Sequence, residues 1–292
     1  MLLIACASTV LVAITAIVYY LLAQSGPAWR HQGLRLITSV SWAPRSPKPS
    51  FGFLGPLFGS AVIAVVALVI ALPIALATAL AINEYVPRRA SRALTALVDL
   101  LAAVPSIVFG LWGLFYINPH LRNTTRWLSR HGDFFPPFRV VGTTLGNSLF
   151  VAGLVVGIMV LPIVASISRE VMSQVPRDQC EAALGLGGTR WGMITNVILP
   201  FSRNGIVGAS MLGLGRAMGE TIAVSIILLT DNRINTHILQ PGGGSISALI
   251  VNEFRGSSEL AQSALTVAGL TLFAITLAVN LLARAVVARS TR

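Results

Sequence analysis

The stretch Phe58–Ile82, "FGSAVIAVVALVIALPIALATALAI", decides the fold class of this chain. It contains no charged residue, and it is longer than the roughly 20 apolar residues that a helix needs to cross a bilayer core of about 30 Å. Further segments reach a similar length, and none alternates apolar and polar residues as a membrane β-strand does. These segments are Leu2–Leu22, Ala93–Ile117, Leu145–Ile167, Ile206–Leu229 and Ala264–Ala283. The sequence therefore predicts an all-α, polytopic membrane protein with six transmembrane helices in a single transmembrane domain, residues 1–292.

Composition agrees with this class. The 292 residues are 54% hydrophobic and only 11% charged, whereas soluble proteins contain roughly 25% charged residues. The net charge of +11 rests on arginine, because Lys48 is the single lysine. Such a charge in a soluble chain would suggest nucleic acid, but here the arginines lie mainly between apolar segments, where they face water and lipid headgroups. We therefore expect membrane lipid around the chain and no nucleic-acid partner.

The ends of the chain are predicted to lie on the same side of the membrane. Leu2–Leu22 is long and has no charge before it, so a retained helix is favoured over a signal peptide. The counts of Arg and Lys in the two sets of loops tie. The shorter loops on the side of the termini have the higher density of positive charge, which weakly favours cytoplasmic termini.

Charged residues inside the apolar segments are candidates for function, because a charge in hydrocarbon is costly. The stretch "LGLGRAMGETIAV", Leu212–Val224, carries Arg216 and Glu220 four residues apart. This spacing places both side chains on the same face of a continuous helix. Either the two side chains form a structural ion pair, or Arg216 lies on a substrate path and Glu220 holds it when no anion is present. Thr221 can add a hydroxyl donor, and Asp99 is a third charge that can also reach the interface. Helix kinks are expected at Pro73, Pro105 and Pro162.

The polar segment 168–204 contains the most specific pattern, "EAALGLGGTRWGMITNVILP", Glu181–Pro200. Its small residues allow a short helix to approach a partner closely, and its glycines allow a sharp turn. Trp191, Ile194 and Ile198 recur at helical spacing and are expected to pack beneath the membrane helices.

This pattern resembles the EAA loop of ABC importer permeases, which reads E-A-A, x3, G, x9, I-x-L-P; only Val197 departs from it. The resemblance implies the type I importer permease fold and a cytoplasmic loop that docks on an ATPase. The docking residues would be Glu181, Ala182, Ala183, Gly187, Leu199 and Pro200. It also places both termini in the cytoplasm of a bacterial cell. ATP hydrolysis would belong to a separate subunit, because a phosphate-binding P-loop needs a G-K-[ST] sequence and Lys48 lies between two prolines.

Three further stretches resemble the PstC-type branch of bacterial phosphate importer permeases: "LLAAVPSIVFGLWGLF" (Leu100–Phe115), Leu212–Val224, and the segment that contains Phe58–Ile82. The resemblance implies inorganic phosphate as substrate and no cofactor or metal. It implies as partners a second, PstA-type permease, two ATPase subunits and an extracytoplasmic phosphate-binding protein. The planar guanidinium of Arg216 suits phosphate oxygens.

Other functions remain open from the residues alone. A permease for another oxyanion, such as sulfate or molybdate, would carry the same EAA loop. An ion-coupled secondary transporter would favour inverted repeats and buried ion ligands, but no repeat is visible and the four histidines lie in loops. An enzyme that acts on lipid would need a nucleophile, a base or a metal cluster, and no such group of residues is recognisable.

Overall fold

The computed structural model describes residues 2–131, 136–140, 145–228 and 231–290, with the side chains of 2–7 and 286–290 excepted. Its α-helices are α1 (Leu2–Gln32), α2 (Arg35–Thr38), α3 (Leu54–Leu80), α4 (Arg88–Ala102), α5 (Ser106–Trp112), α6 (Asn118–His131), α7 (Leu149–Ser173), α8 (Arg177–Gly185), α9 (Arg190–Met193), α10 (Leu199–Gly219), α11 (Ile222–Ile227), α12 (Ile246–Phe254) and α13 (Glu259–Ser290). The π-helical turns η1 (Ala81–Tyr85), η2 (Gly113–Ile117) and η4 (Ile194–Ile198) adjoin α3, α5 and α10, and η3 (Pro136–Phe138) is a 3-10 turn. Strands β1 (Trp42–Ala43) and β2 (Ser50–Phe51) form an antiparallel hairpin.

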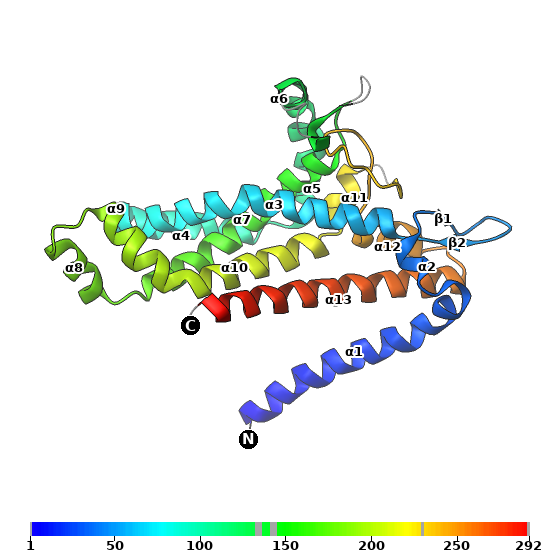
Figure 1. The fold of residues 1–292 in the computed structure, drawn as a ribbon, viewed down its shortest axis with the longest axis horizontal. Helices are drawn as coiled ribbons and strands as arrows, with labels where there is room; N and C mark the ends of the chain where they lie inside the picture. The colour runs from blue at the N-terminus through cyan, green and yellow to red at the C-terminus, as the bar shows by residue number, and fades with distance from the viewer. Residues whose placement is uncertain (1, 132–135, 141–144, 229–230, 291–292) are drawn as a thin grey trace.

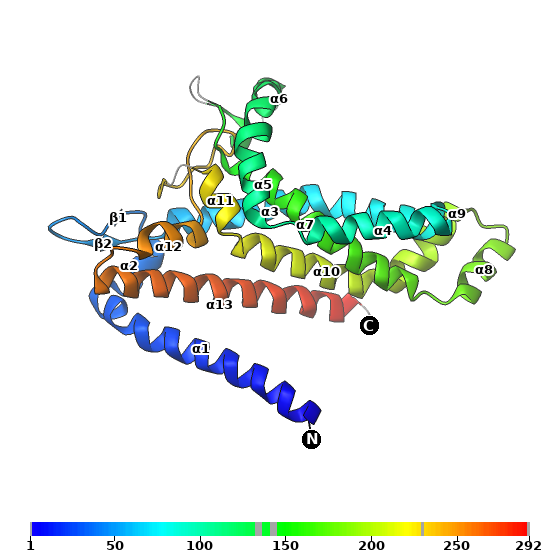
Figure 2. The ribbon, with the colours of Figure 1, turned by 180° about the vertical axis from the view of Figure 1, so that it is seen from behind.

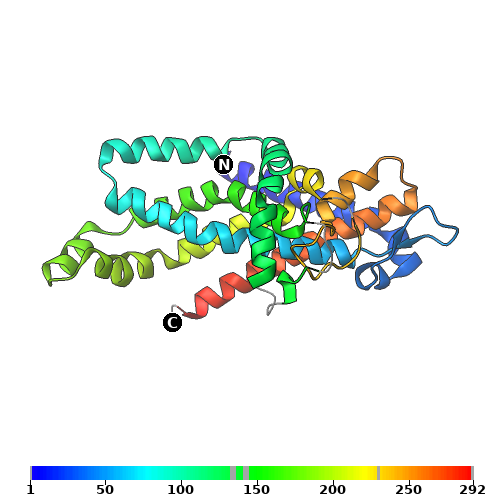
Figure 3. The ribbon, with the colours of Figure 1, turned by 90° about the horizontal axis from the view of Figure 1, so that it is seen from above.

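The long helices lie along one axis of the molecule. Figure 1 shows α3, α7, α10 and α13 side by side, with α8 at one end of the bundle and the β1–β2 hairpin, α2 and α12 at the other. Helix α1 packs on α13 in the opposite direction, so the first described turn of α1 and the last of α13 both point toward the α8 end (Figures 1 and 2). Figure 3 shows the same arrangement from above.

The centre of the bundle is the contact between α3 and α7, which depends on small residues. Ala64, Ala67, Ala71 and Ala75 recur at helical spacing on α3 and are buried. On α7, a Cβ at Gly157 would lie 3.1 Å from the carbonyl oxygen of Ala67. Such stripes let membrane helices approach closely and gain van der Waals contact, which is the main attraction between helices in lipid.

The described residues contain five continuous helices long and apolar enough to span a membrane. These are Ser8–Gln32, Leu54–Tyr85, Leu149–Ser173, Arg190–Gly219 and Glu259–Ala285. The segment predicted as the third span, Ala93–Ile117, is not one helix, because α4 and the α5–α6 helix meet at a bend of 87°. The prediction of six spans holds if this bent pair counts as one. The bend comes directly before Pro105, where the ring disfavours helical geometry in the preceding residue. Pro73 and Pro162 instead lie inside continuous helices.

The predicted span Ile206–Leu229 also differs from the structure. Its helix begins earlier, at Arg190, and ends at Gly219. Glu220 has an extended backbone (ψ 126°), and the separate helix α11 follows. The expectation of one continuous helix through this segment is therefore wrong, while its predicted end, Leu229, lies outside the described residues.

The two long connections between predicted spans, residues 23–57 and 118–144, contain defined elements in their described parts. In the first, α1 continues to Gln32, and the ring of Trp42 packs edge-on against that of Phe51 in the hairpin, with centroids 5.6 Å apart. In the second, α6 leaves the bundle at a steep angle (Figures 1 and 2).

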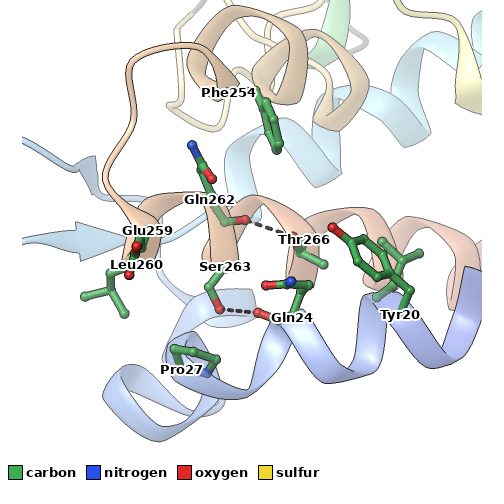
Figure 4. A pocket seen from close by; sticks show the side chains of 10 residues that line it. Tyr20, Gln24, Pro27, Phe254, Glu259, Leu260, Gln262, Ser263 and Thr266 are labelled. Atoms are coloured by element: carbon green, nitrogen blue, oxygen red, sulfur yellow. Dashed lines mark hydrogen bonds between the residues drawn. The ribbon is translucent and has the colours of Figure 1, made fainter.

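A serine of α13 attaches this helix to α1, because its hydroxyl bonds to the backbone of α1. Ser263 donates to the carbonyl oxygen of Gln24 (2.7 Å) and accepts from the amide of Ala28 (3.1 Å). The hydroxyl thus bridges two backbone groups of successive turns of α1, next to Pro27, which has no amide hydrogen to give. These residues border a pocket of about 740 Å³ between the two helices (Figure 4).

Candidate functional site

The break between α10 and α11 is held by the residues that the sequence singled out. Glu220 is only 8% exposed, and its Oε1 accepts a hydrogen bond from the amide of Ala223 (3.2 Å). The hydroxyl of Thr221 donates to the carbonyl oxygen of Gly219 (3.1 Å). Both side chains therefore satisfy backbone groups that the end of one helix and the start of the next leave without partners.

Arg216 is not paired with Glu220 in this structure. Because α10 ends at Gly219, Glu220 no longer lies one helical turn along the same face. The side chain of Arg216 is exposed, and it forms no ion pair with any carboxylate in the part of the chain that the structure describes. The sequence-based geometry of the pair was wrong because it assumed a continuous helix.

Arg216 lies on a face of α10 that the chain leaves uncovered. Gly208, Leu212, Arg216 and Gly219 recur every three or four residues and are all exposed, Leu212 at 61%. The opposite face packs on α7, where a Cβ at Gly213 would lie 2.8 Å from the side chains of α7 valines. Arg216 is thus presented to whatever lies beside this chain in the membrane.

Helix α4 contributes a second uncovered surface next to α7. No residue of α4 is buried, and its apolar side chains include the exposed Leu97 and Leu100. Asp99 is also exposed, and it accepts a hydrogen bond from the hydroxyl of Ser166 on α7 (3.2 Å). Since α4 and α10 both pack on α7 (Figure 2), Asp99 and Arg216 flank the same central helix.

The EAA pattern forms a projecting helix and turn. The connection between α7 and α9 covers residues 174–189, which is shorter than the predicted polar segment 168–204, because the long helices extend into it. Helix α8 carries Glu181, Ala182 and Ala183 and has no buried residue. Gly187 adopts a positive φ of 83°, so the predicted turn at this glycine is confirmed. Leu186, at the tip, is 90% exposed.

The second half of the pattern joins the projection to the bundle. Ile194 and Ile198 are buried as expected, but Trp191 is 63% exposed and does not pack beneath the membrane helices. Trp191 and Leu199 instead line an apolar groove of about 420 Å³ with residues of α3 and η1. Pro200 is the second residue of α10 and follows the π-helical turn η4, inside the helix that runs from Arg190 to Gly219.

Two further features were not anticipated from the sequence. Ser247 on α12 donates to the carbonyl oxygen of Met218 (3.4 Å) and so anchors the end of α10. Three arginines also line a cavity beside α8. Across the described residues, no group of three or more His, Cys, Asp or Glu side chains is placed to hold a metal ion.

Comparison with known proteins gives consistent results. Residues 71–292 match the family described as binding-protein-dependent transport system inner membrane component. Phosphate transport system permease protein PstC 2 of Mycobacterium tuberculosis is 42% identical over 286 residues, which cover 97% of this chain and 88% of that protein. PstC of Xylella fastidiosa (strain 9a5c) is 37% identical over 295 residues, which cover 100% of this chain and 90% of the relative.

The fold also matches a solved structure. A chain of a bacterial alginate ABC transporter, in complex with a periplasmic protein bound to an alginate pentasaccharide, aligns with a TM-score of 0.65 at 17% identity, over 100% of this chain and 95% of that one. At this identity the match supports the fold alone. The sequence matches go further: this chain is a multi-pass membrane permease subunit that belongs to the binding-protein-dependent transport system inner membrane component family, within its group of PstC-type permeases.

Proposed function

We propose that this chain is a permease subunit of an ATP-driven importer that carries inorganic phosphate into the bacterial cytoplasm. The observation that carries the proposal is the 42% identity, over nearly the whole chain, to a relative named as a phosphate transport permease. The geometry adds an uncovered guanidinium, Arg216, on α10 beside a break in the helix.

Arg216 suits a phosphate anion in a translocation path. Its guanidinium stays charged and offers a planar fork that matches phosphate oxygens. An anion that loses water in a region of low dielectric needs such donors to replace it. Because Glu220 is engaged with the Ala223 amide, the guanidinium is available to an incoming anion without first breaking an internal ion pair.

The partners are those that the family resemblance implies, and the uncovered surfaces support a place for each of them. A second, PstA-type permease would cover the α4 and α10 faces and enclose the path between the two chains. Two ATPase subunits would hydrolyse ATP. One of them would dock on the α8 projection through the EAA residues Glu181 to Gly187, together with Leu199 and Pro200 at the start of α10. An extracytoplasmic phosphate-binding protein would deliver phosphate at the end that carries the β1–β2 hairpin. Both termini would then be cytoplasmic, in the plasma membrane.

Replacement of Arg216 tests the role of this residue. Arg216→Gln should abolish phosphate uptake while the ATPase and the second permease still co-purify, and Arg216→Lys should restore it only in part, because a point charge lacks the fork. Arg203→Gln, which removes another exposed arginine of α10 far from the break, should transport normally. Normal uptake by an assembled Arg216→Gln importer would leave the residue without a role in transport.

Another oxyanion remains the alternative substrate, because sulfate and molybdate also fit a guanidinium. Uptake of labelled phosphate in the presence of excess sulfate or molybdate separates these possibilities. Phosphate uptake that is insensitive to both competitors supports the proposal, and efficient sulfate or molybdate uptake by the same complex contradicts it.

A further inference from the structure

Helix α6 leaves the bundle at the level where the spanning helix α7 begins. Its first residue, Asn118, donates to the side-chain oxygen of Asn147 (2.5 Å) and accepts from the amide of Asn147 (3.0 Å), two residues before α7. Helix α7 has 25 residues, about 38 Å at 1.5 Å per residue, and a bilayer core of about 30 Å takes up most of this length. The other end of α7 leads to α8. The start of α6 therefore lies at the membrane surface opposite α8.

The direction of α6 is that of the membrane plane. The helix Ser106–His131, which contains α6, meets α4 at 87°, and α4 packs on the spanning helix α7 (Figure 2). The described connections 136–140 and 231–245 lie beside α6 on the side away from α8 (Figures 1 and 2). Because α6 projects beyond the long helices in both views, its side toward α8 is left open to the bilayer.

Arg122, Arg126 and Arg130 form an arginine stripe on α6. They are spaced four residues apart and are all exposed, as neighbours along one face of a helix. None of them forms an ion pair or a side-chain hydrogen bond within the part of the chain that the structure describes. Helix α6 itself contains no Asp or Glu, and Asp133, the next acidic residue, lies outside the described residues. One carboxylate can neutralise only one of the three arginines, so the stripe needs further anions.

Aromatic rings accompany the arginine stripe along the same helix. Trp112 stacks on Tyr116, with ring centroids 6.0 Å apart, and Trp127 stacks on His131 at 4.7 Å. The two tryptophans and the tyrosine are exposed, Trp127 at 59%. Trp and Tyr concentrate at membrane–water interfaces, because their rings are apolar and carry one polar group. A basic helix in water would gain nothing from these rings, whereas basic and aromatic side chains together are typical of a helix that lies on a membrane.

We infer that α6 lies on the surface of the leaflet opposite α8 and binds the phosphate groups of anionic phospholipids through the arginine stripe. A guanidinium donates two parallel hydrogen bonds to such a phosphate, and the exposed rings would lie at the level of the headgroups. An acidic surface of a protein partner is the competing occupant, but the open side of α6 faces the bilayer. The inference depends on neither the transported substrate nor the side of the membrane that is cytoplasmic, so failure of the proposed function would leave it standing.

The position of α6 is measured with a nitroxide attached to Asn123→Cys, an exposed position of this helix. The assembled importer would carry Cys6→Ser and Cys180→Ser, which remove both native cysteines of this chain, in nanodiscs of phosphatidylcholine and phosphatidylglycerol. The same importer without Asn123→Cys gives the background from the partner subunits. Collisions with oxygen, which concentrates in lipid, and with a water-soluble nickel chelate should place the nitroxide among the headgroups, whereas Lys48→Cys in the hairpin should report water.

Two other results of this measurement would overturn the inference. Free access of the nickel chelate at position 123, equal to that at position 48, would show a helix surrounded by water. Protection of position 123 from both oxygen and the chelate would show that a protein covers α6.

The preference for anionic lipid is measured with a fluorophore on the same Asn123→Cys. A small, equal mole fraction of phosphatidylglycerol or phosphatidylcholine that carries a quenching nitroxide is added to phosphatidylcholine nanodiscs. Quenching by phosphatidylglycerol should be stronger by about fivefold or more, the factor that one arginine near an anionic surface contributes. This ratio should fall at high salt, because exposed charges are screened.

Variants assign the preference to the arginine stripe. Arg122→Gln, Arg126→Gln and Arg130→Gln together should abolish it, and Lys at the same three positions should keep most of it, because the charge remains. The control removes three exposed arginines on the same side of the membrane, Arg30→Gln, Arg35→Gln and Arg45→Gln. It should leave the ratio unchanged, and co-purification of the partner subunits verifies the assembly of each variant. Equal quenching by both lipids with the stripe intact, or a preference that survives its replacement by Gln, would show the inference to be wrong.

Discussion

Glu220 has a structural task in this chain that its charge alone does not suggest. Its carboxylate is buried and accepts from the amide of Ala223, so it starts α11 directly after α10 ends. Arg216 is left exposed on α10. The two residues that look like a pair in the sequence therefore act separately here: one fixes the break in the backbone, and the other presents a charge beside it.

Replacement of Glu220 should separate these roles. Glu220→Gln keeps a carbonyl oxygen that can accept from Ala223, so assembly should persist and the melting temperature of the complex should change little. Glu220→Ala removes the acceptor and should cost about 1–3 kcal/mol, the usual penalty for an unsatisfied buried group. Thermal unfolding of the purified importer measures both. If Glu220→Gln destabilises the complex as much as Glu220→Ala, the negative charge itself is required, as an ion pair with Arg216 would demand.

Cys180 should react more slowly than an ordinary cysteine at neutral pH. Burial raises the pKa of its thiol, and the carboxylates of Glu84, Asp178 and Glu181 raise this pKa further. Because the thiolate is the reactive form, the alkylation rate should keep rising at pH values above those at which an ordinary thiol has already titrated.

The matched variants are Glu84→Gln and Glu170→Gln. The first removes a negative neighbour, lowers the pKa of Cys180 and should speed alkylation by a neutral maleimide at pH 7.5. Glu170 does not contribute to the shift, so its replacement should have no effect. An unchanged rate profile in Glu84→Gln would show that this carboxylate does not influence the thiol.

At the scale of elements, the α8 projection shows how a short pattern builds an exposed helix and a tight turn. Helix α8 is exposed except where Cys180 and Ala183 pack against the bundle. The turn at Gly187 reverses the chain so that Arg190 can begin the long helix that continues into α10. The projection thus has a fixed geometry although few of its side chains are buried.

Gly187→Ala tests whether the turn matters. A residue with a side chain pays about 1–2 kcal/mol in left-handed geometry, and the space around Gly187 is open, so strain and not a clash is the expected defect. Coupling of ATP hydrolysis to uptake should fall while the chain still inserts. Gly185→Ala is the control, because Gly185 also has open space and lies in helical geometry. Equal coupling in both variants would exclude a specific role for the turn.

At the scale of the whole molecule, the first described turn of α1 and the last of α13 lie on the side of α8. Helices α1 and α13 run antiparallel beside each other, and their outer ends point toward the α8 side (Figure 1). The arginine counts could not decide the orientation, but a common side for the termini and α8 agrees with the cytoplasmic termini that the EAA resemblance implies.

Reporter fusions test this topology. A reporter that is active only outside the cytoplasm should be silent at residue 292 and active when inserted at Gly256. This glycine lies in an exposed turn between α12 and α13, where an added Cβ would meet no atom within 4 Å. The reverse pattern would contradict the proposed orientation. Activity at both positions would show that α13 does not cross the membrane.

The sequence by itself determined the membrane class, most of the spans and the turn at Gly187. Apolar length is a local property, and Phe58–Ile82 or Leu145–Ile167 can be recognised without any neighbour. The turn at Gly187 was also predictable, because a fixed pattern of glycines and alanines encodes it. The position of the bend beside Pro105 could be predicted from the sequence, but its angle could not. A proline predicts an interruption of the helix, and packing sets the angle.

The tertiary structure alone decided where charged side chains act. Helical periodicity extends through Glu220, so the sequence predicts a pair with Arg216; the helix ends there because Glu220 bonds to the next helix and α12 holds the end of α10. The cavity lined by Arg88, Arg177 and Arg190 brings together residues about a hundred positions apart. In the sequence, two of these arginines share the tripeptide Val-Pro-Arg. Small residues on α3 and α7 fix these two helices side by side. This long-range packing determines which helix N-termini lie close together, and no short window of sequence contains the contact.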